Sequence, residues 1–236
     1  MRKITKLYKI FRQPRYYKAL FSGVAAAVEH ESLLRSICCK TIIDIGANRG
    51  QFSLVARHCF RDAQIFAFEP LSKPCEKFRT LFSDDKNVIL HDVAVGPENG
   101  SVVIHISARD DSSSLLPITA LQEALFPGTN EKTTESIRVR LLDAMIRPAQ
   151  ITTPAMLKLD VQGYELQALK GCENLLRKFQ YVYAECSFVE LYQGQALADE
   201  VISFLHPKGF ALDGVYNTDY DLSGRAIQSD LLFRKE

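Results

Sequence analysis

The sequence predicts an α/β fold in which a mostly parallel sheet carries helices on both faces. Short apolar runs over residues 41–45, 64–68 and 88–90 alternate with segments of helical periodicity. The same alternation resumes at 155–159 and 181–184. Each run is almost continuously apolar, as expected for strands that are buried on both sides of a parallel sheet. Strands that alternate with helices in this way define the doubly covered α/β class.

The elements between these strands follow from the spacing of apolar residues and from turn signals. Helices are expected within 17–37, 52–60, 72–82 and 166–176, where apolar residues recur at helical intervals. Ser72 can cap the third of these helices. Residues 101–106 alternate as an extra strand, and the chain ends in a hairpin-like pair at 210–212 and 231–233.

Residues 107–137 form a long polar stretch rich in turn residues. A connection of this length within a compact domain is usually functional or mobile. The sequence therefore predicts that this stretch is a substrate lid.

Composition excludes some classes of partner and favours one compartment. Among 236 residues, 24% are charged and the net charge is +1, which gives no electrostatic case for nucleic acid. The six cysteines form no C-x-x-C pair and have no histidine at zinc-ligand spacing, so no metal is expected. Reduced thiols favour a cytoplasmic protein. The longest apolar stretch, residues 19–28, is too short to span a bilayer.

The first 18 residues carry seven lysines and arginines and no acidic residue. We expect residues 1–37 to be a basic helical extension and residues 38–236 to be the functional domain. A solvated, partly frayed helix is favoured over an anchor, so deletion of residues 1–18 should leave thermal stability nearly unchanged. Weak contact with an anionic membrane surface is the alternative. The oligomeric state is left open.

The segment that follows the first strand, Asp44-Ile-Gly46-Ala-Asn48-Arg-Gly50-Gln-Phe52, indicates a ligand site. Gly46 allows a tight turn and close approach of a ligand, and Gly50 allows the next helix to pack closely on the sheet. In open α/β sheets, ligands bind beyond the carboxyl ends of the strands, where this turn lies.

Two further acidic residues end the neighbouring strands. Glu69 is placed for the two hydroxyls of a ribose, and Asp92 is placed near an adenine. A dinucleotide site prefers a second glycine where this chain has Asn48, and Asp44 would repel a pyrophosphate. Asp44 could instead attract a cation or an amino group. A nicotinamide-dependent oxidoreductase is therefore the less favoured enzyme class.

Three segments resemble the signatures of the FkbM-type methyltransferases. They are Asp44 to Phe52, Phe68-Glu69-Pro70, and Lys158-Leu-Asp160-Val-Gln-Gly163-Tyr-Glu165. The resemblance extends from about residue 25 to the C-terminus. One departure is Gln162, where the family commonly has glutamate, and the loss of that carboxylate argues against a metal bound near Asp160.

The resemblance implies a Rossmann-like class I methyltransferase fold with a seven-stranded sheet whose last strand is antiparallel. It also implies S-adenosyl-L-methionine as the methyl donor and a hydroxyl as the acceptor. The cofactor-binding residues expected on this basis are Asp44, Gly46, Ala47, Asn48, Gly50, Phe52, Glu69, Pro70, Asp92, Val93 and Asp160.

Methyl transfer to an alcohol needs alignment and a base that takes the hydroxyl proton. Asp160 follows the fourth strand of the predicted sheet and Glu185 follows the fifth, so both are catalytic candidates at one edge. Asp160 is the preferred base. Glu165 is read as a residue of the helix start, where a carboxylate suits the helix dipole.

The acceptor cannot be read from the fold, because function resides in the loops. We expect O-methylation of a sugar, a glycolipid or a polyketide-like small molecule. A non-catalytic module that retains the fold is the remaining alternative. Several tyrosines could line the acceptor pocket, namely Tyr16, Tyr17, Tyr192, Tyr216 and Tyr220.

Overall fold

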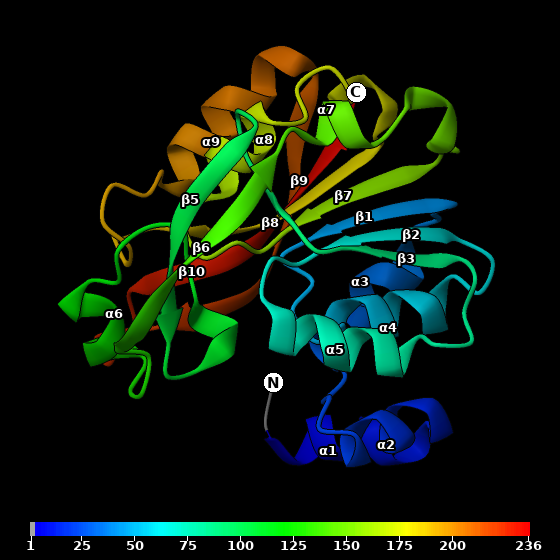
Figure 1. Ribbon diagram of the computed structural model, residues 1–236, viewed down its shortest axis with the longest axis horizontal. Coiled ribbons are helices and arrows are strands. Elements are labelled where there is room, and N and C mark those ends of the chain that lie inside the picture. Colours follow the sequence, from blue (N-terminus) through cyan, green and yellow to red (C-terminus); the bar gives the residue numbers. More distant parts are fainter. Residues whose placement is uncertain (1–2) are drawn as a thin grey trace.

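A seven-stranded sheet forms the centre of the protein, with the order β3-β2-β1-β7-β8-β10-β9 (Figure 1). The computed structural model describes residues 3–236, and the side chains of all of these except residues 3–5 and 110. Five strands run parallel and β10 is antiparallel to β8, which confirms the predicted fold class. The strands are β1 (Thr41–Ile45), β2 (Gln64–Phe68), β3 (Val88–His91), β7 (Ala155–Leu159), β8 (Tyr181–Ser187), β9 (Phe210–Tyr220) and β10 (Ala226–Lys235).

Helices cover both faces of this sheet (Figure 1). One face carries α3 (Glu31–Ser36), α4 (Gln51–Cys59) and α5 (Ser72–Leu81), and the other carries α7 (Leu142–Met145), α8 (Glu165–Lys170) and α9 (Ala198–Leu205). Every residue of β1 and β7 is buried, as their apolar sequences predict. Short 3-10 helices complete the chain: η1 (Val28–His30), η2 (Asp110–Ser112), η3 (Pro148–Gln150), η4 (Leu176–Lys178) and η5 (His206–Lys208).

The strand register brings the candidate residues to one edge of the sheet. Ile45, the last residue of β1, pairs with Phe68 of β2 and with Leu159 of β7. Leu159 in turn pairs with Ala184 of β8. The residues that follow these strand positions are Gly46, Glu69, Asp160 and Glu185. Their common location follows directly from parallel pairing of strands of equal length.

A second, three-stranded sheet has the order β4-β6-β5 and was not expected. It consists of β4 (Ala94–Val95), β5 (Gly100–Ser107) and β6 (Glu131–Arg140), and α6 (Ala120–Leu125) lies between β5 and β6 in the chain. The predicted loop 107–137 is therefore partly regular structure. The strand β6 was missed because most of its side chains are polar and exposed, so it lacks the alternation that marks a half-buried strand.

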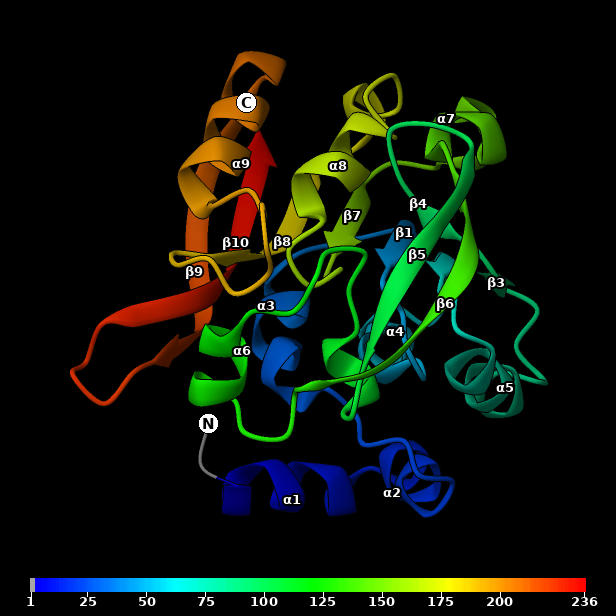
Figure 2. The same ribbon diagram turned by 60° about the vertical axis from the view of Figure 1, so that its left-hand side comes forward.

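Some element boundaries also differ from the expectation. The helix expected over 166–176 ends at Lys170, because Gly171 packs against the backbone of Gly96, where an added Cβ would lie 2.2 Å from the carbonyl oxygen. The C-terminal pair β9 and β10 is much longer than predicted and reaches beyond the rest of the sheet (Figure 2).

The N-terminal helices α1 (Lys3–Arg12) and α2 (Pro14–Phe21) lie against the domain on the side of α4 (Figure 2). Ile10, Tyr16 and Ala19 are buried and share a hydrophobic cluster with Phe52 and Tyr183 of the main domain. The interpretation of this segment as a solvated extension is therefore wrong, because one side of it belongs to the core. The division of the chain at residue 37 stays a prediction. Within residues 3–236, no helix is both long and apolar enough to cross a bilayer.

Candidate active site

A cleft of ≈ 1060 Å³ opens at the carboxyl edge of the seven-stranded sheet. The glycine-bearing turn after β1 and the end of β2 line one part of it, and the ends of β7, β8 and β10 line another. Residues 109, 111–115, 122 and 126, all within the predicted lid, complete the wall. Of the residues predicted to bind the cofactor, Gly46, Ala47, Asn48, Phe52, Glu69, Pro70 and Asp160 line this cleft.

The turn after β1 requires glycine because two strand ends meet there. Gly46 has a φ of +79°, and a Cβ added to it would lie 1.8 Å from the backbone oxygen of Asp160. The backbone N–H groups of Gly46 and Ala47 both donate to the carbonyl of Phe68 at 3.0 Å. Close packing of the chain on itself thus explains the glycine, whereas the sequence suggested close approach of a ligand.

Glu69 is held in the cleft wall by the backbone around it. Its Oε2 accepts from the N–H of Asn48 at 2.9 Å, and its Oε1 accepts from the N–H of Leu71 at 2.9 Å. The backbone therefore fixes the orientation of both oxygens of this carboxylate. An oriented carboxylate of this kind suits a pair of adjacent hydroxyls.

Lys158, a buried residue of the cleft lining, forms ion pairs with two carboxylates. Its Nζ lies 3.3 Å from Asp44 Oδ1 and 3.4 Å from Asp160 Oδ2. Burial alone would lower the pKa of Lys158, but the Asp160 and Asp44 carboxylates raise it above its ordinary value. Ser53 also donates to Asp44 at 2.6 Å.

Asp44, which the sequence suggested could attract a cation or an amino group, contacts the Lys158 ammonium and the Ser53 hydroxyl. Its contact with the methyl donor stays a prediction. Its side chain is fully buried and does not line the cleft, because Lys158 and Ser53 occupy its oxygens. Its observed role is to hold the Lys158 ammonium beneath Asp160.

The two catalytic candidates, Asp160 and Glu185, are joined by the side-chain amide of Gln162. This amide donates to Asp160 Oδ1 and to Glu185 Oε2, both at 2.8 Å. Its oxygen accepts from the hydroxyl of Tyr192 at 2.7 Å, which fixes the orientation of the amide. Burial, together with the Asp160 and Asp230 carboxylates, raises the pKa of Glu185 well above its ordinary value.

Glu165 supports this turn from below and stays outside the cleft lining. Its Oε1 accepts from the N–H groups of Val161 at 3.0 Å and Gly163 at 3.2 Å. Burial raises the pKa of Glu165 to about 7. This placement fits the expectation that Glu165 is a helix-start residue.

A polar cluster that the sequence reasoning missed lies further along the cleft wall. His30 Nδ1 lies 2.9 Å from the Tyr183 hydroxyl and 3.6 Å from Asp230 Oδ2, and Asn217 donates to the same carboxylate at 2.8 Å. Asp230 pairs directly with Glu185 across β10 and β8. The sequence carried only a weak signal for this cluster, because Gln228 and Asp230 alternate with three buried positions of which one, Ser229, is itself polar.

The described side chains include no group of three or more His, Cys, Asp or Glu residues arranged to hold a metal ion.

Gly50 does not line the cleft. It begins α4 with a φ of +91°, and an added Cβ would lie 2.8 Å from the ring of Phe82. Gly50 therefore allows the start of α4 to approach the ring of Phe82, which follows α5. The sequence suggested instead that this glycine allows α4 to pack closely on the sheet.

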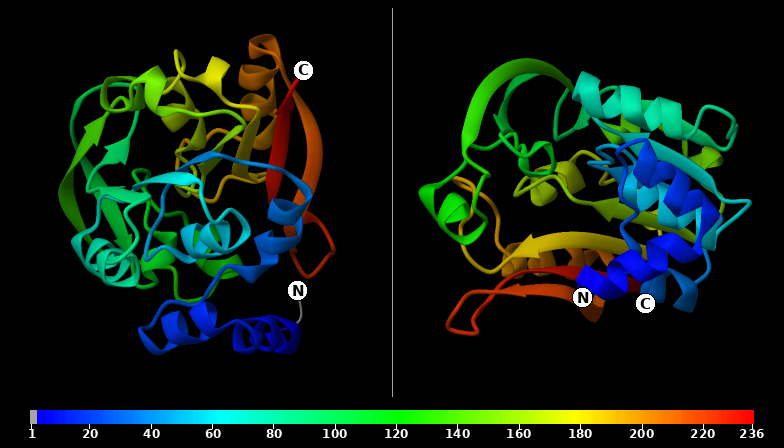
Figure 3. Two further views of the ribbon diagram at one scale, coloured as in Figure 1. Left: turned by 90° about the vertical axis from the view of Figure 1, so that its right-hand side faces the viewer. Right: turned by 90° about the horizontal axis from the view of Figure 1, so that it is seen from below.

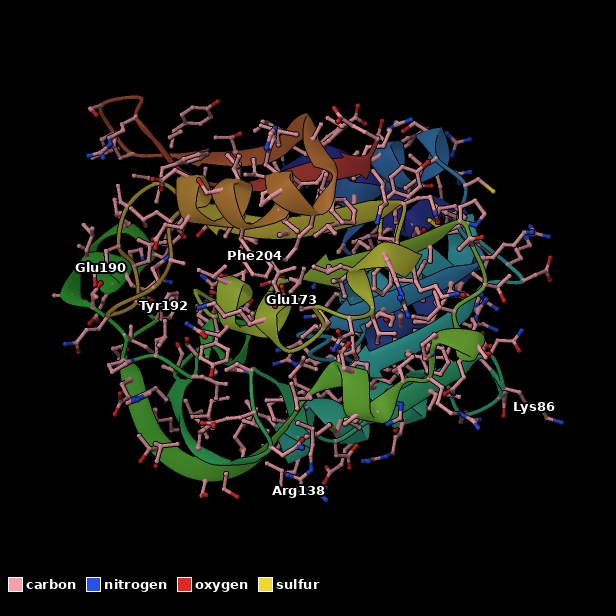
Figure 4. The ribbon with its side chains drawn as sticks, turned by 90° about the horizontal axis from the view of Figure 1, so that it is seen from above. Lys86, Arg138, Glu173, Glu190, Tyr192 and Phe204 are labelled. Carbon is pink, nitrogen blue, oxygen red and sulfur yellow. The ribbon has the colours of Figure 1, made fainter. Side chains whose placement is uncertain are left out.

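Asp92 and Val93 also lie outside the cleft. The Asp92 carboxylate forms an ion pair with Arg79, and its carbonyl accepts from Arg138 at 3.3 Å. Arg138 lies at a different edge of the molecule from Tyr192 (Figure 4). The Asp92 carboxylate is thus engaged by Arg79 of α5. The placement of Asp92 beside an adenine stays a prediction.

The predicted lid is attached to the catalytic turn. Ser114 donates from its hydroxyl to the carbonyl of Gln162 at 2.6 Å, and its backbone exchanges hydrogen bonds with His105. Tyr192 lies behind this segment, with its hydroxyl oxygen 3.2 Å from the carbonyl oxygen of Ser112. The five tyrosines suggested for the acceptor pocket do not line the cleft, whereas Tyr164 does.

Comparison with known proteins assigns this architecture to a class. Residues 44–212 match the methyltransferase FkbM domain, and the chain belongs to this family. A 2-O-methyltransferase, NoeI, from Sinorhizobium fredii is 28% identical over 175 residues, covering 70% of each chain. The hexuronic acid methyltransferase AglP from Haloferax volcanii is 28% identical over 145 residues, covering 60% of this chain and 54% of AglP. A solved Klebsiella pneumoniae structure, classed as an O-methyltransferase, has the same fold, with a TM-score of 0.52, 13% identity and 99% and 96% coverage.

The protein is thus an S-adenosyl-L-methionine-dependent methyltransferase, and the match supports O-methylation over the oxidoreductase alternative. The residues present fit this donor. Glu69 offers oriented acceptors for ribose hydroxyls, and Gly46, Ala47 and Asn48 form the turn on which the donor would rest. When bound, the donor supplies an electrophilic methyl group on a sulfonium.

Proposed function

We propose that the enzyme methylates a hydroxyl group of a carbohydrate acceptor. The names of two relatives support this class, since one is a 2-O-methyltransferase and the other acts on hexuronic acid. The cleft supports it independently, because carboxylates and amides from β7, β8, β9 and β10 line it next to the glycine turn. These groups match the hydroxyls of a sugar, whereas a polyketide-like acceptor would leave many of them unpaired.

The observation that carries the proposal is the pair of carboxylates joined by Gln162. Asp160 Oδ2 lies 3.4 Å from the buried ammonium of Lys158, and this ion pair suits a carboxylate that orients the acceptor. The Glu185 oxygens accept hydrogen bonds from the neutral side-chain amides of Gln162 and Gln228. Burial and the Asp160 and Asp230 carboxylates raise the pKa of Glu185 well above its ordinary value, which makes its carboxylate a stronger proton acceptor than an ordinary glutamate.

In this proposal Asp160 orients the acceptor hydroxyl and Glu185 takes its proton as the new oxygen–methyl bond forms. The base role thereby moves from Asp160, the residue preferred on sequence alone, to Glu185. The Gln162 amide keeps the two carboxylates in a fixed relation and stabilises the charge on each. The segment 109–115 acts as the lid of the cleft, and the enzyme works in the cytoplasm.

The test begins with an acceptor found by mass spectrometry, after a glycan and glycolipid extract is incubated with methyl-labelled donor. Glu185→Gln should lower kcat by about 10²–10⁴-fold and abolish the loss of activity toward acid pH. Asp160→Asn should lower kcat by about 10–100-fold, because only the alignment of the acceptor hydroxyl is lost. The activity of this variant should still fall toward acid pH, which is the acid limb of the pH profile. If Asp160→Asn removes the acid limb and Glu185→Gln keeps it, the base is Asp160. If only apolar acceptors are methylated, the carbohydrate assignment is wrong.

A further inference from the structure

The helices α1 and α2 have an exposed apolar face opposite their buried one. Ile10, Tyr16 and Ala19 point into the core, whereas Phe11 is 58% exposed and Phe21 is 77% exposed. In the view from below, α1 and α2 form the layer nearest the viewer (Figure 3). The large exposed apolar side chains on these two helices are Leu7, Tyr8, Phe11, Tyr17 and Phe21.

Three of these side chains, Phe11, Tyr17 and Phe21, form a continuous aromatic row that spans both helices. The rings of Phe11 and Tyr17 have centroids 6.2 Å apart, and those of Tyr17 and Phe21 are 4.9 Å apart in an edge-to-face arrangement. Arg12 lies over the ring of Tyr8. Scattered exposed apolar residues need no explanation, but a contiguous exposed aromatic row marks an interaction site.

The charge of the same helices has one sign. Arg12, Arg15 and Lys18 are exposed, and no acidic residue occurs before Glu29. Glu29 is already engaged by Lys6 at 2.9 Å. Aromatic and aliphatic side chains flanked by unopposed basic residues are the composition of helices that lie in the interface of an anionic bilayer.

We propose that the α1–α2 surface docks on an anionic phospholipid bilayer. Phe11, Tyr17 and Phe21 enter the headgroup region, and Arg12, Arg15 and Lys18 contact the lipid phosphates. The contact is stronger than the weak one suggested by charge alone, because the exposed rings add apolar burial to electrostatic attraction.

The docking surface adjoins the cleft. Lys6, Leu20 and Gly23, which belong to the same helices and the turn after them, line the cleft. Docking would therefore bring the mouth of the cleft close to the bilayer, where a lipid-linked acceptor would be within reach. The docking itself does not depend on the proposed acceptor.

The experiment is co-sedimentation of the full chain with vesicles of 30% phosphatidylglycerol in phosphatidylcholine and with pure phosphatidylcholine vesicles. We expect binding to the anionic vesicles that falls as salt is raised to 0.5 M. Phe11→Ser combined with Phe21→Ser should weaken the partition by about tenfold or more. Arg15→Glu combined with Lys18→Glu should do so as well, with loss of the preference for anionic lipid.

Leu222→Ser is the matched control, because Leu222 is fully exposed on the turn between β9 and β10, outside the docking surface. It should bind as the unmodified protein does, and all variants should keep their thermal unfolding and S-adenosylhomocysteine binding. Absence of binding to anionic vesicles, or equal loss in Leu222→Ser, overturns the proposal. Self-association that the Phe11 and Phe21 variants abolish, without vesicle binding, would assign the surface to a second copy of the chain.

Discussion

Gln162 shows how one residue can set the chemistry of a site. A glutamate in its place could still accept from Tyr192, but it could not donate to Asp160 and Glu185. Three carboxylates would then repel one another unless a cation were bound between them. The amide removes that requirement, and its left-handed backbone, with a φ of +53°, places it between the two acids.

Glu165 gives a prediction about stability and pH. Its pKa is about 7 in the folded protein and about 4.3 in an unfolded chain. The folded state therefore binds more protons between these values, and its stability decreases as pH rises through that window. Glu165→Gln keeps the oxygen that accepts from Val161 and Gly163, and it removes the ionisation.

We expect Glu165→Gln to match the parent protein near pH 4 and to exceed it in unfolding free energy at pH 8. The difference should approach about 4 kcal/mol, since one pKa unit corresponds to about 1.4 kcal/mol. Urea unfolding of both proteins at the two pH values measures it. A variant that is less stable than the parent at both pH values would show that the charged form of Glu165 is needed.

At the scale of elements, the β1–α4 turn is fixed by the approach of β7. Gly46→Ala would force its Cβ into the Asp160 carbonyl, so the two strand ends must separate. We expect a loss of several kcal/mol in unfolding free energy and loss of S-adenosylhomocysteine binding in calorimetry. Gly224→Ala is the control, because Gly224 has a similar φ of +84° but no atom within 4 Å of an added Cβ. Equal effects of both variants would mean that backbone conformation alone matters at Gly46.

The elements that sequence patterns predicted best are those with buried, local signals. β1, β2 and β7 begin and end where their apolar runs do, and the register between them then positions Gly46 and Asp160. β6 could not be found, because most of its side chains are polar and exposed, so it shows no apolar alternation although it is the central strand of its sheet. Asp44 lies near the end of β1 and Asp92 directly follows β3, as expected. Whether their side chains reach the cleft depends on their ion-pair partners, Lys158 and Arg79, which the spacing along the sequence does not reveal.

At the scale of the whole molecule, the N-terminal helices join the core and the surface. A separable extension was expected because seven lysines and arginines dominate the first 18 residues, whereas few of their neighbours are buried. Ile10, Tyr16 and Ala19 nevertheless fill the space beside α4. Apolar residues at a helix–domain contact are hard to distinguish from an isolated amphipathic helix, because both have the same periodicity.

Tyr16 tests this attachment. Its side chain is fully buried, its ring lies edge-to-face with His58 at 5.1 Å, and its hydroxyl has no hydrogen-bond partner among the described groups. Tyr16→Phe should therefore leave the protein as stable or slightly more stable, because a buried hydroxyl without a partner costs free energy. Tyr16→Ala should lower the unfolding free energy by about 3–5 kcal/mol, as for other buried aromatic residues.

Deletion of residues 1–21 should likewise lower the melting temperature, in contrast to the small effect expected from the sequence. Differential scanning calorimetry of the three proteins beside the full chain makes the comparison. If Tyr16→Ala and the deletion both have the melting temperature of the parent protein, the contact of the helices with the domain contributes no stability. The bilayer contact alone would then hold the helices in place. If Tyr16→Phe is as harmful as Tyr16→Ala, the hydroxyl has a partner and the ring is not the main source of stability. The expected order, with Tyr16→Phe near the parent and the other two well below it, would make the α1–α2 segment a structural part of the domain that also carries its lipid-facing surface.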